Sequence, residues 1–179
     1  NLREDHEGVY KFVLDAALKL KNASADCLVL CANTLHQYAD RIVEEVKLPV
    51  IHIADATAVE IKKQGLSTIG LLGTRFTMEM DFYKKRLNET GINSIVPEKP
   101  ERLFIHDTIM NELLKEIYKP ESKKRFLEII NDLEQKGAQG IVLGCTEIPL
   151  LIKQSDTHLP VFNTLKIHAK AAVDFAVKE

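Results

Sequence analysis

The chain has 179 residues, of which 45% are hydrophobic and 28% charged, with a net charge of −2. This composition is typical of globular proteins and allows one domain or two small ones. The near-neutral charge gives no reason to expect binding to nucleic acid or to an anionic membrane surface, and we find no apolar run of about 18 residues that would cross a membrane. Three cysteines are too few for a disulfide framework, so we expect a reducing, cytoplasmic location.

Hydrophobic periodicity predicts helices that alternate with strands along the chain. We expect helices at 9–20, 35–46, 56–63, 108–118, 121–136, 148–153 and 164–178, with another that follows the loop 73–77 and ends near 89. We expect strands at 27–30, 48–53, 67–72, 94–96 and 159–162, and a buried strand that ends at Gly144. Strands that alternate with helices indicate an α/β fold with parallel strands.

Two parts of the chain repeat each other. Residues 25–34 align without a gap on residues 138–147, and residues 48–50 align on residues 159–161 at nearly the same spacing. We therefore expect two similar parallel-sheet α/β/α domains related by pseudo-two-fold symmetry. Their strand ends would face each other, with the active site in the cleft between the domains.

The repeat also predicts the domain boundaries. We expect residues 1–55 plus 161–179 to form the first domain and residues 56–160 to form the second. The second half has an additional strand and helix before its repeated segment. We therefore expect about 46 or more residues, carrying the matching strand and helix of the first domain, to be absent from this chain.

Cys145 follows the strand that ends at Gly144. Open α/β sheets hold their chemistry at the carboxyl ends of parallel strands. A helix that begins directly after Cys145 would lower the pKa of its thiol and attract a substrate carboxylate. An inert buried cysteine beside a turn fits the same local pattern, so position alone leaves both interpretations open.

Three motifs, each after an expected strand, together resemble the aspartate/glutamate racemase family: Leu30 to His36, Gly73 to Thr77 and Gly144 to Glu147. The chain is most similar to the broad-specificity members. The resemblance implies a cofactor-independent enzyme, without pyridoxal phosphate or metal, that is often dimeric and acts on a small-molecule amino acid. In this family, one cysteine reaches the substrate α-carbon from each side. The site residues so implied are the catalytic Cys145 and Cys31 and the substrate-binding Asn33, Thr34, Thr77, Thr146 and Thr74.

The sequence departs from the family pattern at Ala32. The first catalytic cysteine of the family stands directly before the Asn-Thr pair, whereas here Cys31 lies one residue earlier. A shift by one residue at a strand end normally turns a side chain to the other face. Whether Cys31 reaches the cleft is therefore open. If it does not, one face of the substrate lacks a proton donor, and we expect either a strongly one-directional racemase or slow turnover through water.

The leading expectation is racemisation of aspartate or glutamate by thiol-based abstraction and return of the α-proton, in a homodimer. One alternative is a related single-cysteine enzyme, such as a hydantoin racemase or a decarboxylase. Another is a catalytically lapsed protein that binds acidic amino acids. Glu147, His36 and His106 lie near the expected cleft, and the sequence leaves their roles open.

Overall fold

The computed structural model describes residues 5–177. The helices are α1 (His6–Asn22), α2 (Ala39–Val46), α3 (Ile53–Lys63), α4 (Arg75–Glu79), α5 (Asp81–Glu89), α6 (Lys99–Asn111), α7 (Pro120–Gln135), α8 (Ile148–Leu151) and α9 (Thr164–Ala176). Three short 3₁₀ helices are η1 (Asn33–Tyr38), η2 (Leu113–Lys115) and η3 (Gln154–Asp156). The strands are β1 (Thr68–Gly73), β2 (Asn93–Ile95), β3 (Ile141–Gly144) and β4 (Val161–Asn163).

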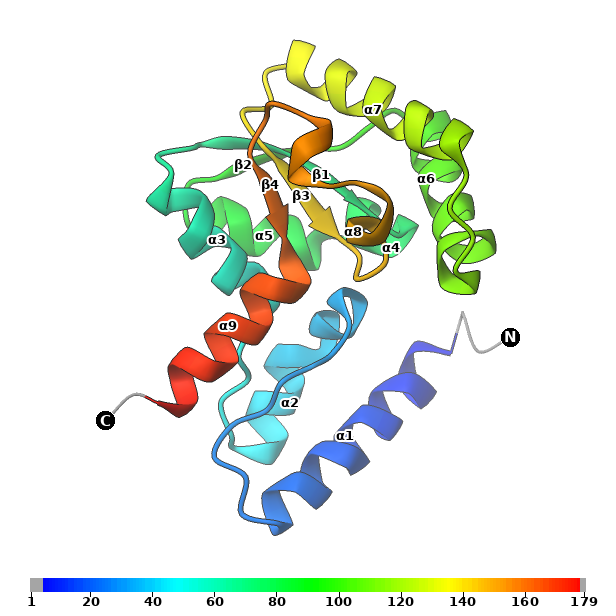
Figure 1. The fold of residues 1–179 in the computed structure, drawn as a ribbon. Coiled ribbons are helices and arrows are strands. Elements are labelled where there is room, and N and C mark those ends of the chain that lie inside the picture. The colour runs from blue at the N-terminus through cyan, green and yellow to red at the C-terminus, as the bar shows by residue number, and fades with distance from the viewer. Residues whose placement is uncertain (1–4, 178–179) are drawn as a thin grey trace.

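The four strands form one parallel sheet in the order β2-β1-β3-β4 (Figure 1). Apolar side chains of α6, α7 and α8 pack on one face of the sheet, and those of α3 and α5 pack on the other. Each face of β1 and β3 is therefore covered, as parallel sheets require. The α/β class that the sequence predicted is confirmed.

The N-terminal residues form a smaller unit with its own core. Tyr10 and Val13 of α1 share one buried hydrophobic cluster with Ile42 and Val46 of α2 and with Leu28. Figure 1 shows α1 and α2 side by side, on the side of the sheet where β3 ends. The unit thus brings the segment that precedes η1 towards the carboxyl ends of the strands.

The strands expected at 27–30 and 48–53 are wrong in extent. Only Leu28 and Val50 pair, in parallel, as a single isolated bridge. Pro49 has no N–H to donate, and Ile53 already begins α3, whose first turn is capped by the His52 side chain. A parallel pair with no further neighbouring strand is marginal. The pairing nevertheless matches that of Ile141 with Val161, as the internal repeat predicts.

Other differences concern the ends of elements. The expected helix at 108–118 is the end of α6 followed by η2, because Glu98 and Glu101 form a capping box that starts α6 at Lys99. The expected loop 73–77 already contains the first turn of α4. Finally, β4 pairs with β3, so residues 161–163 lie in the four-stranded sheet, whereas the sequence placed them with residues 1–55.

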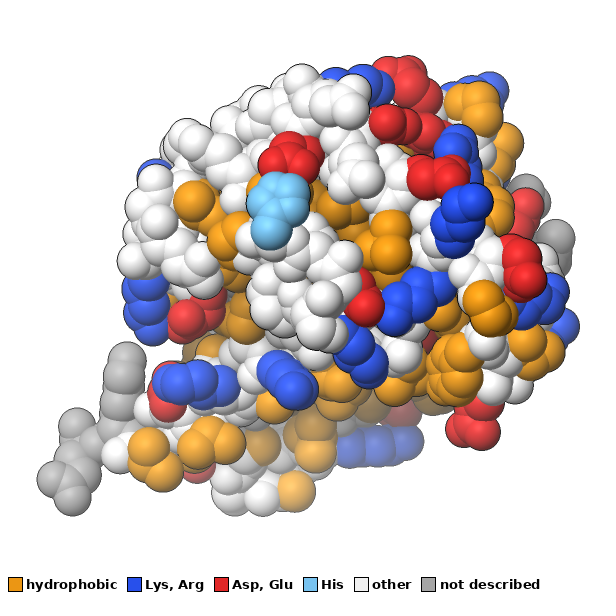
Figure 2. Space-filling view, turned by 45° about the horizontal axis from the view of Figure 1, so that its top comes forward, with side chains coloured by type: hydrophobic (Ala, Val, Ile, Leu, Met, Phe, Trp, Pro, Cys, Tyr) orange, Lys and Arg blue, Asp and Glu red, His pale blue; other side chains and the backbone are white. Residues whose placement is uncertain are grey.

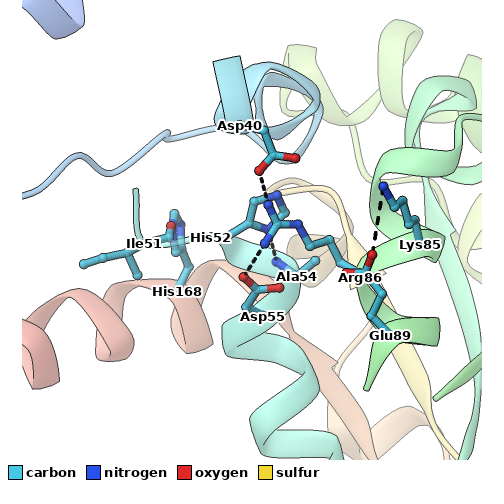
Figure 3. A network of polar contacts seen from close by, with 9 residues as sticks. All are labelled: Asp40, Ile51, His52, Ala54, Asp55, Lys85, Arg86, Glu89 and His168. Carbon is cyan, nitrogen blue, oxygen red and sulfur yellow. Dashed lines mark hydrogen bonds and ion pairs between the residues drawn. The ribbon is translucent and has the colours of Figure 1, made fainter. Parts of the chain in front are cut away.

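Arg86 of α5 joins three helices. Its guanidinium pairs with Asp40 of α2 and, at 2.9 Å, with Asp55 of α3 (Figure 3). Asp40 is contributed by the N-terminal unit, whereas Arg86 and Asp55 belong to helices that cover the sheet. The ion pairs therefore hold the smaller unit against the larger one.

The surface carries charges of both signs. On the face shown in Figure 2, Lys and Arg side chains are interspersed with Asp and Glu side chains, and hydrophobic side chains lie between them. Within residues 5–177, no helix is both long and apolar enough to span a membrane.

Candidate active site

A cavity of about 210 Å³ lies where the carboxyl ends of β1 and β3 meet the segment before η1. Its lining comes from both units and is, in chain order, Ala32, Asn33, Thr34, Thr74, Thr77, Ile109, Met110, Leu114, Gly144, Cys145, Thr146 and Glu147. The structure thus brings together six of the seven site residues that the family resemblance implied, all except Cys31.

Two glycines allow the ends of β1 and β3 and the Thr77 side chain to approach closely beside the cavity. Gly73 and Gly144 are opposite each other at the ends of β1 and β3. A Cβ atom added to Gly73 would lie 2.9 Å from the Gly144 carbonyl oxygen, and one added to Gly144 would lie 3.0 Å from the Thr77 methyl group. Only glycine at these positions lets Thr77 pack over both strand ends.

Cys145 is hydrogen-bonded to a carboxylate. Its thiol is 7% exposed and donates to Oε2 of Glu147 across 2.9 Å, while Oε1 of Glu147 accepts the hydroxyl of Thr146 at 2.7 Å. Burial and, after it, the hydrogen bond to Glu147 raise the pKa of Cys145 to about 12. The thiol therefore keeps its proton at neutral pH.

The direction of this pKa shift corrects the sequence-based expectation. A helix beginning after Cys145 was expected to lower the pKa, but α8 begins only at Ile148 and has four residues. The dipole of one turn is outweighed by loss of solvent and by the neighbouring carboxylate.

Four threonines line the cavity together with Cys145. They are Thr34, Thr74, Thr77 and Thr146. The hydroxyls of Thr74 and Thr77 are hydrogen-bonded to each other at 3.3 Å, and Thr77 is fully buried in the first turn after β1. Hydroxyl groups both donate and accept, so this lining suits a ligand that carries a carboxylate.

Ala32 and Cys31 lie on opposite sides of their segment. Ala32 lines the cavity, whereas Cys31 is exposed and its thiol lies 3.8 Å from the Val29 carbonyl oxygen. The alternation is regular, since Leu28 and Leu30 are buried while Val29 is exposed. Cys31 is therefore turned to the surface by the period of an extended chain, and a methyl group stands where the family places its first cysteine.

Three buried histidines pack together behind the Ala32 loop. The rings of His52 and His168 lie 4.7 Å and 5.1 Å from that of His36. Burial lowers all three pKa values, to about 3 for His36 and about 4 for His52. In His52 the charge of Arg86 adds to the effect (Figure 3). The three rings are therefore neutral at neutral pH.

The hydrogen bonds of these rings tie the loop to the fold. His36 Nδ1 donates to the carbonyl oxygen of Ala32 at 3.0 Å, and His168 Nε2 donates to that of Ile51 at 2.6 Å, since a carbonyl can only accept. His36 does not line the cavity, and it contacts the site through Ala32, which does. His106 also lies outside the lining, and its Nδ1 accepts from the backbone N–H of Arg75 at 3.4 Å.

Several residues of the site were not found from sequence. Ile109, Met110 and Leu114 form an apolar wall, and their helical spacing indicated only a core face. Thr164 was also missed, although it stands at the end of the strand next to that of Cys145. Asn163, the last residue of β4, and Thr164 form an Asn-Thr pair of the same composition as residues 33–34, and this signal could have pointed to it. Within residues 5–177 no group of ligands suited to a metal ion is found.

Known proteins place the chain in a family. The family model described as Asp/Glu/hydantoin racemase matches residues 1–172. The chain belongs to the Asp/Glu/hydantoin racemase family. The crystal structure of a proposed Asp/Glu racemase from Yersinia pestis has a TM-score of 0.93 and 44% sequence identity, covering 99% of this chain and 77% of that chain.

Two relatives of assigned function have lower sequence identity to this chain than the Yersinia pestis protein has. The broad specificity amino-acid racemase RacX of Bacillus subtilis (strain 168) is 24% identical over 172 residues, covering 94% of this chain and 73% of RacX. The glutamate racemase of Persephonella marina is 28% identical over 173 residues, covering 91% of this chain. The chain spans 63% of the length of that glutamate racemase.

Proposed function

We propose that this protein is an enzyme that moves the α-proton of aspartate or glutamate without a cofactor, with Cys145 as the reacting thiol. One observation carries the proposal. The thiol of Cys145 is hydrogen-bonded to the carboxylate of Glu147, in a cavity lined by residues of both units of the fold. Family membership and the names of the relatives support the same chemistry.

Glu147 gives the thiol a route to its reactive form. In the resting site Cys145 holds the proton and Glu147 accepts its hydrogen bond. Transfer of that proton to Oε2 leaves a thiolate and a neutral carboxylic acid. The thiolate then takes the α-proton, and the negative charge passes to the substrate carbanion. A substrate ammonium group beside the sulfur would favour this transfer, since an opposite charge stabilises the thiolate.

The carbanion needs hydrogen-bond donors that are already in place. Thr34, Thr74, Thr77 and Thr146 line the cavity, and we assign their hydroxyls to binding the substrate carboxylates. Asn33 lines the same cavity, and we assign it to binding the substrate. Donors held before the reaction stabilise developing charge without reorganisation. No Lys or Arg side chain is among the described residues that line the cavity.

Ala32 makes the two faces of the substrate unequal. A methyl group cannot donate a proton, so the return of a proton from that face falls to water or to a hydroxyl, which are far weaker acids than a thiol. The two enantiomers are equally stable, so reversibility requires the same kcat/KM for racemisation from either one. We therefore propose that the unequal faces appear as faster exchange of the α-proton with solvent in the enantiomer whose α-proton faces Cys145. Cys31, exposed and outside the cavity lining, has no part in this scheme.

Decarboxylation is the second candidate. A thiol that keeps its proton is suited to protonate a carbanion formed by loss of carbon dioxide, and that reaction needs a donor on one face only. The raised pKa of Cys145 and the single thiol in the cavity lining favour this candidate. A malonate that loses carbon dioxide in the presence of the protein would identify it.

Chiral chromatography of products from each enantiomer of aspartate and glutamate tests the proposal. The Cys145→Ser variant should lose at least about a hundredfold in rate, whereas Cys27→Ser, outside the cavity, should not change it. Equal rates of α-proton exchange with solvent in the two enantiomers would contradict the unequal faces, and no turnover by the wild-type protein would contradict racemisation. We also propose that the protein is a cytoplasmic homodimer. Light scattering would detect the dimer as twice the mass of one chain.

A further inference from the structure

One hydroxyl connects the two walls of the cavity. Thr164, the first residue of α9, is fully buried. Its Oγ1 donates to the Leu143 carbonyl oxygen at 2.8 Å and lies 3.2 Å from Nδ2 of Asn33. Leu143 precedes the Gly144-Cys145 pair on one wall, and Asn33 stands on the other. The side chain of Thr164 is itself outside the cavity lining.

The directions of these two bonds fix the orientation of the Asn33 amide. A threonine hydroxyl has one proton, and a carbonyl oxygen can only accept. The proton of Thr164 is therefore given to Leu143, and its oxygen can only accept from Asn33. The end of the amide that meets Thr164 must be the NH₂ group. The other end, Oδ1, is consequently the free acceptor.

This acceptor has no hydrogen-bond partner among residues 5–177. Asn33 is 4% exposed, it lines the cavity, and its Oδ1 is buried without a hydrogen bond. Leaving a buried acceptor unpaired is costly unless a ligand completes it. An acceptor requires a donor, and the donor of an acidic amino acid is its ammonium group, since both ionised carboxylates only accept.

We propose that Thr164 is a positioning residue that holds the Asn33 carbonyl oxygen ready for the ammonium group of the substrate, and so selects amino acids over the diacids that lack nitrogen. The proposal rests on the proposed function, because it takes an acidic amino acid as the ligand. If the hydroxyl is lost, the amide is free to turn and to present its NH₂ group, which suits a carboxylate instead.

Thr164→Val removes the hydroxyl at almost unchanged shape, and Thr164→Ser keeps it. Thr57 supplies a matched control, since it is equally buried, donates to the Ile53 carbonyl oxygen at 2.7 Å and accepts from the Tyr83 hydroxyl at 3.3 Å. Thr57 is outside the cavity lining. Thr57→Val therefore loses a similar buried hydroxyl without touching Asn33.

Calorimetric titration of each variant with L-aspartate and L-glutamate, and with succinate and glutarate, tests the proposal. Thr164→Val should bind the amino acid about tenfold more weakly, with no loss of affinity for the matching diacid. Thr164→Ser and Thr57→Val should bind the amino acid as the wild-type protein does. Thermal melting of each variant shows whether it is folded.

Four results would overturn the inference. They are unchanged amino-acid affinity in Thr164→Val, an equal loss for amino acid and diacid, an equal loss in Thr57→Val, and a tenfold loss in Thr164→Ser. If Thr164→Val does not fold, the affinity of Thr164→Ser for the amino acid decides whether the inference holds. Wild-type protein that binds neither aspartate nor glutamate would remove the proposed function and this inference together, whereas the four results above remove only the inference.

Discussion

Acid should destabilise this protein through the buried histidines beneath the candidate site. His36 and His52 are neutral in the folded protein because burial lowers their pKa values to about 3 and about 4. In the unfolded chain each has the ordinary pKa of about 6.5. As the pH falls below that value, the unfolded chain takes up protons that the folded protein does not. The free energy of unfolding therefore decreases as the pH falls from about 6.5 towards 4.

The size of the effect follows from linkage. Each histidine that stays neutral loses about 1.4 kcal/mol of stability for each pH unit below its unfolded pKa. At pH 5 the cost is about 2 kcal/mol for each ring, or about 4 kcal/mol for His36 and His52 together, with a further loss in the same direction from His168. This is a large part of the about 5–15 kcal/mol that holds a typical domain folded.

Urea unfolding at pH 7 and at pH 5 measures this difference. His36→Met, which cannot be protonated, should reduce the loss between the two pH values by about 2 kcal/mol relative to the wild-type protein. His158→Gln is the control, because the His158 side chain is 72% exposed. An equal pH dependence in wild-type protein and His36→Met would refute the assignment to the buried rings.

Three further predictions concern the thiol, the ion pairs and Ala32. Glu147→Gln removes a hydrogen bond and a charge that raise the pKa of Cys145. Iodoacetamide should therefore alkylate Cys145 of this variant at pH 8 faster than it alkylates Cys145 of the wild-type protein. Mass spectrometry measures the alkylation rate, and an unchanged rate would contradict this prediction. Arg86→Met should lower the free energy of urea unfolding by about 1 kcal/mol, because the ion pairs of Arg86 join the two units. A variant as stable as the wild-type protein would show that these ion pairs contribute nothing to stability. Ala32→Cys should raise the rate of racemisation from both enantiomers, because a proton donor on the second face serves both directions, and an unchanged rate in chiral chromatography would count against the assigned face.

The sequence predicts the sheet well because its strands are buried on both faces. The strand expected at 67–72 contains the apolar run 69–72, and the strand ending at Gly144 is apolar from Ile141. These runs lie between helical patterns, and they form β1 and β3. The alternation of an extended chain likewise explains why Cys31 and Ala32 face opposite sides. These features depend on local pattern and period, which one sequence contains.

The remaining features depend on contacts between distant parts of the chain. The paired strands at Leu28 and Val50 shrink to one bridge, because no further strand among the described residues lies beside them. The pKa of Cys145 rises chiefly because the folded chain buries its thiol, which the motif does not contain, and then because Glu147, which the motif does contain, accepts its hydrogen bond. Thr164 meets Asn33 only through the folded arrangement of α9 and η1.

Exchange of the α-proton in deuterium oxide tests the central claim most directly. We predict that wild-type protein incorporates deuterium at the α-carbon of aspartate or glutamate, seen by loss of the α-proton signal in NMR spectra. We predict that Cys145→Ala abolishes the exchange. Cys31→Ala, which removes the exposed thiol outside the cavity lining, should leave the exchange unchanged. Exchange that persists in Cys145→Ala, or an amino acid that binds to the wild-type protein without any exchange, would contradict the claim.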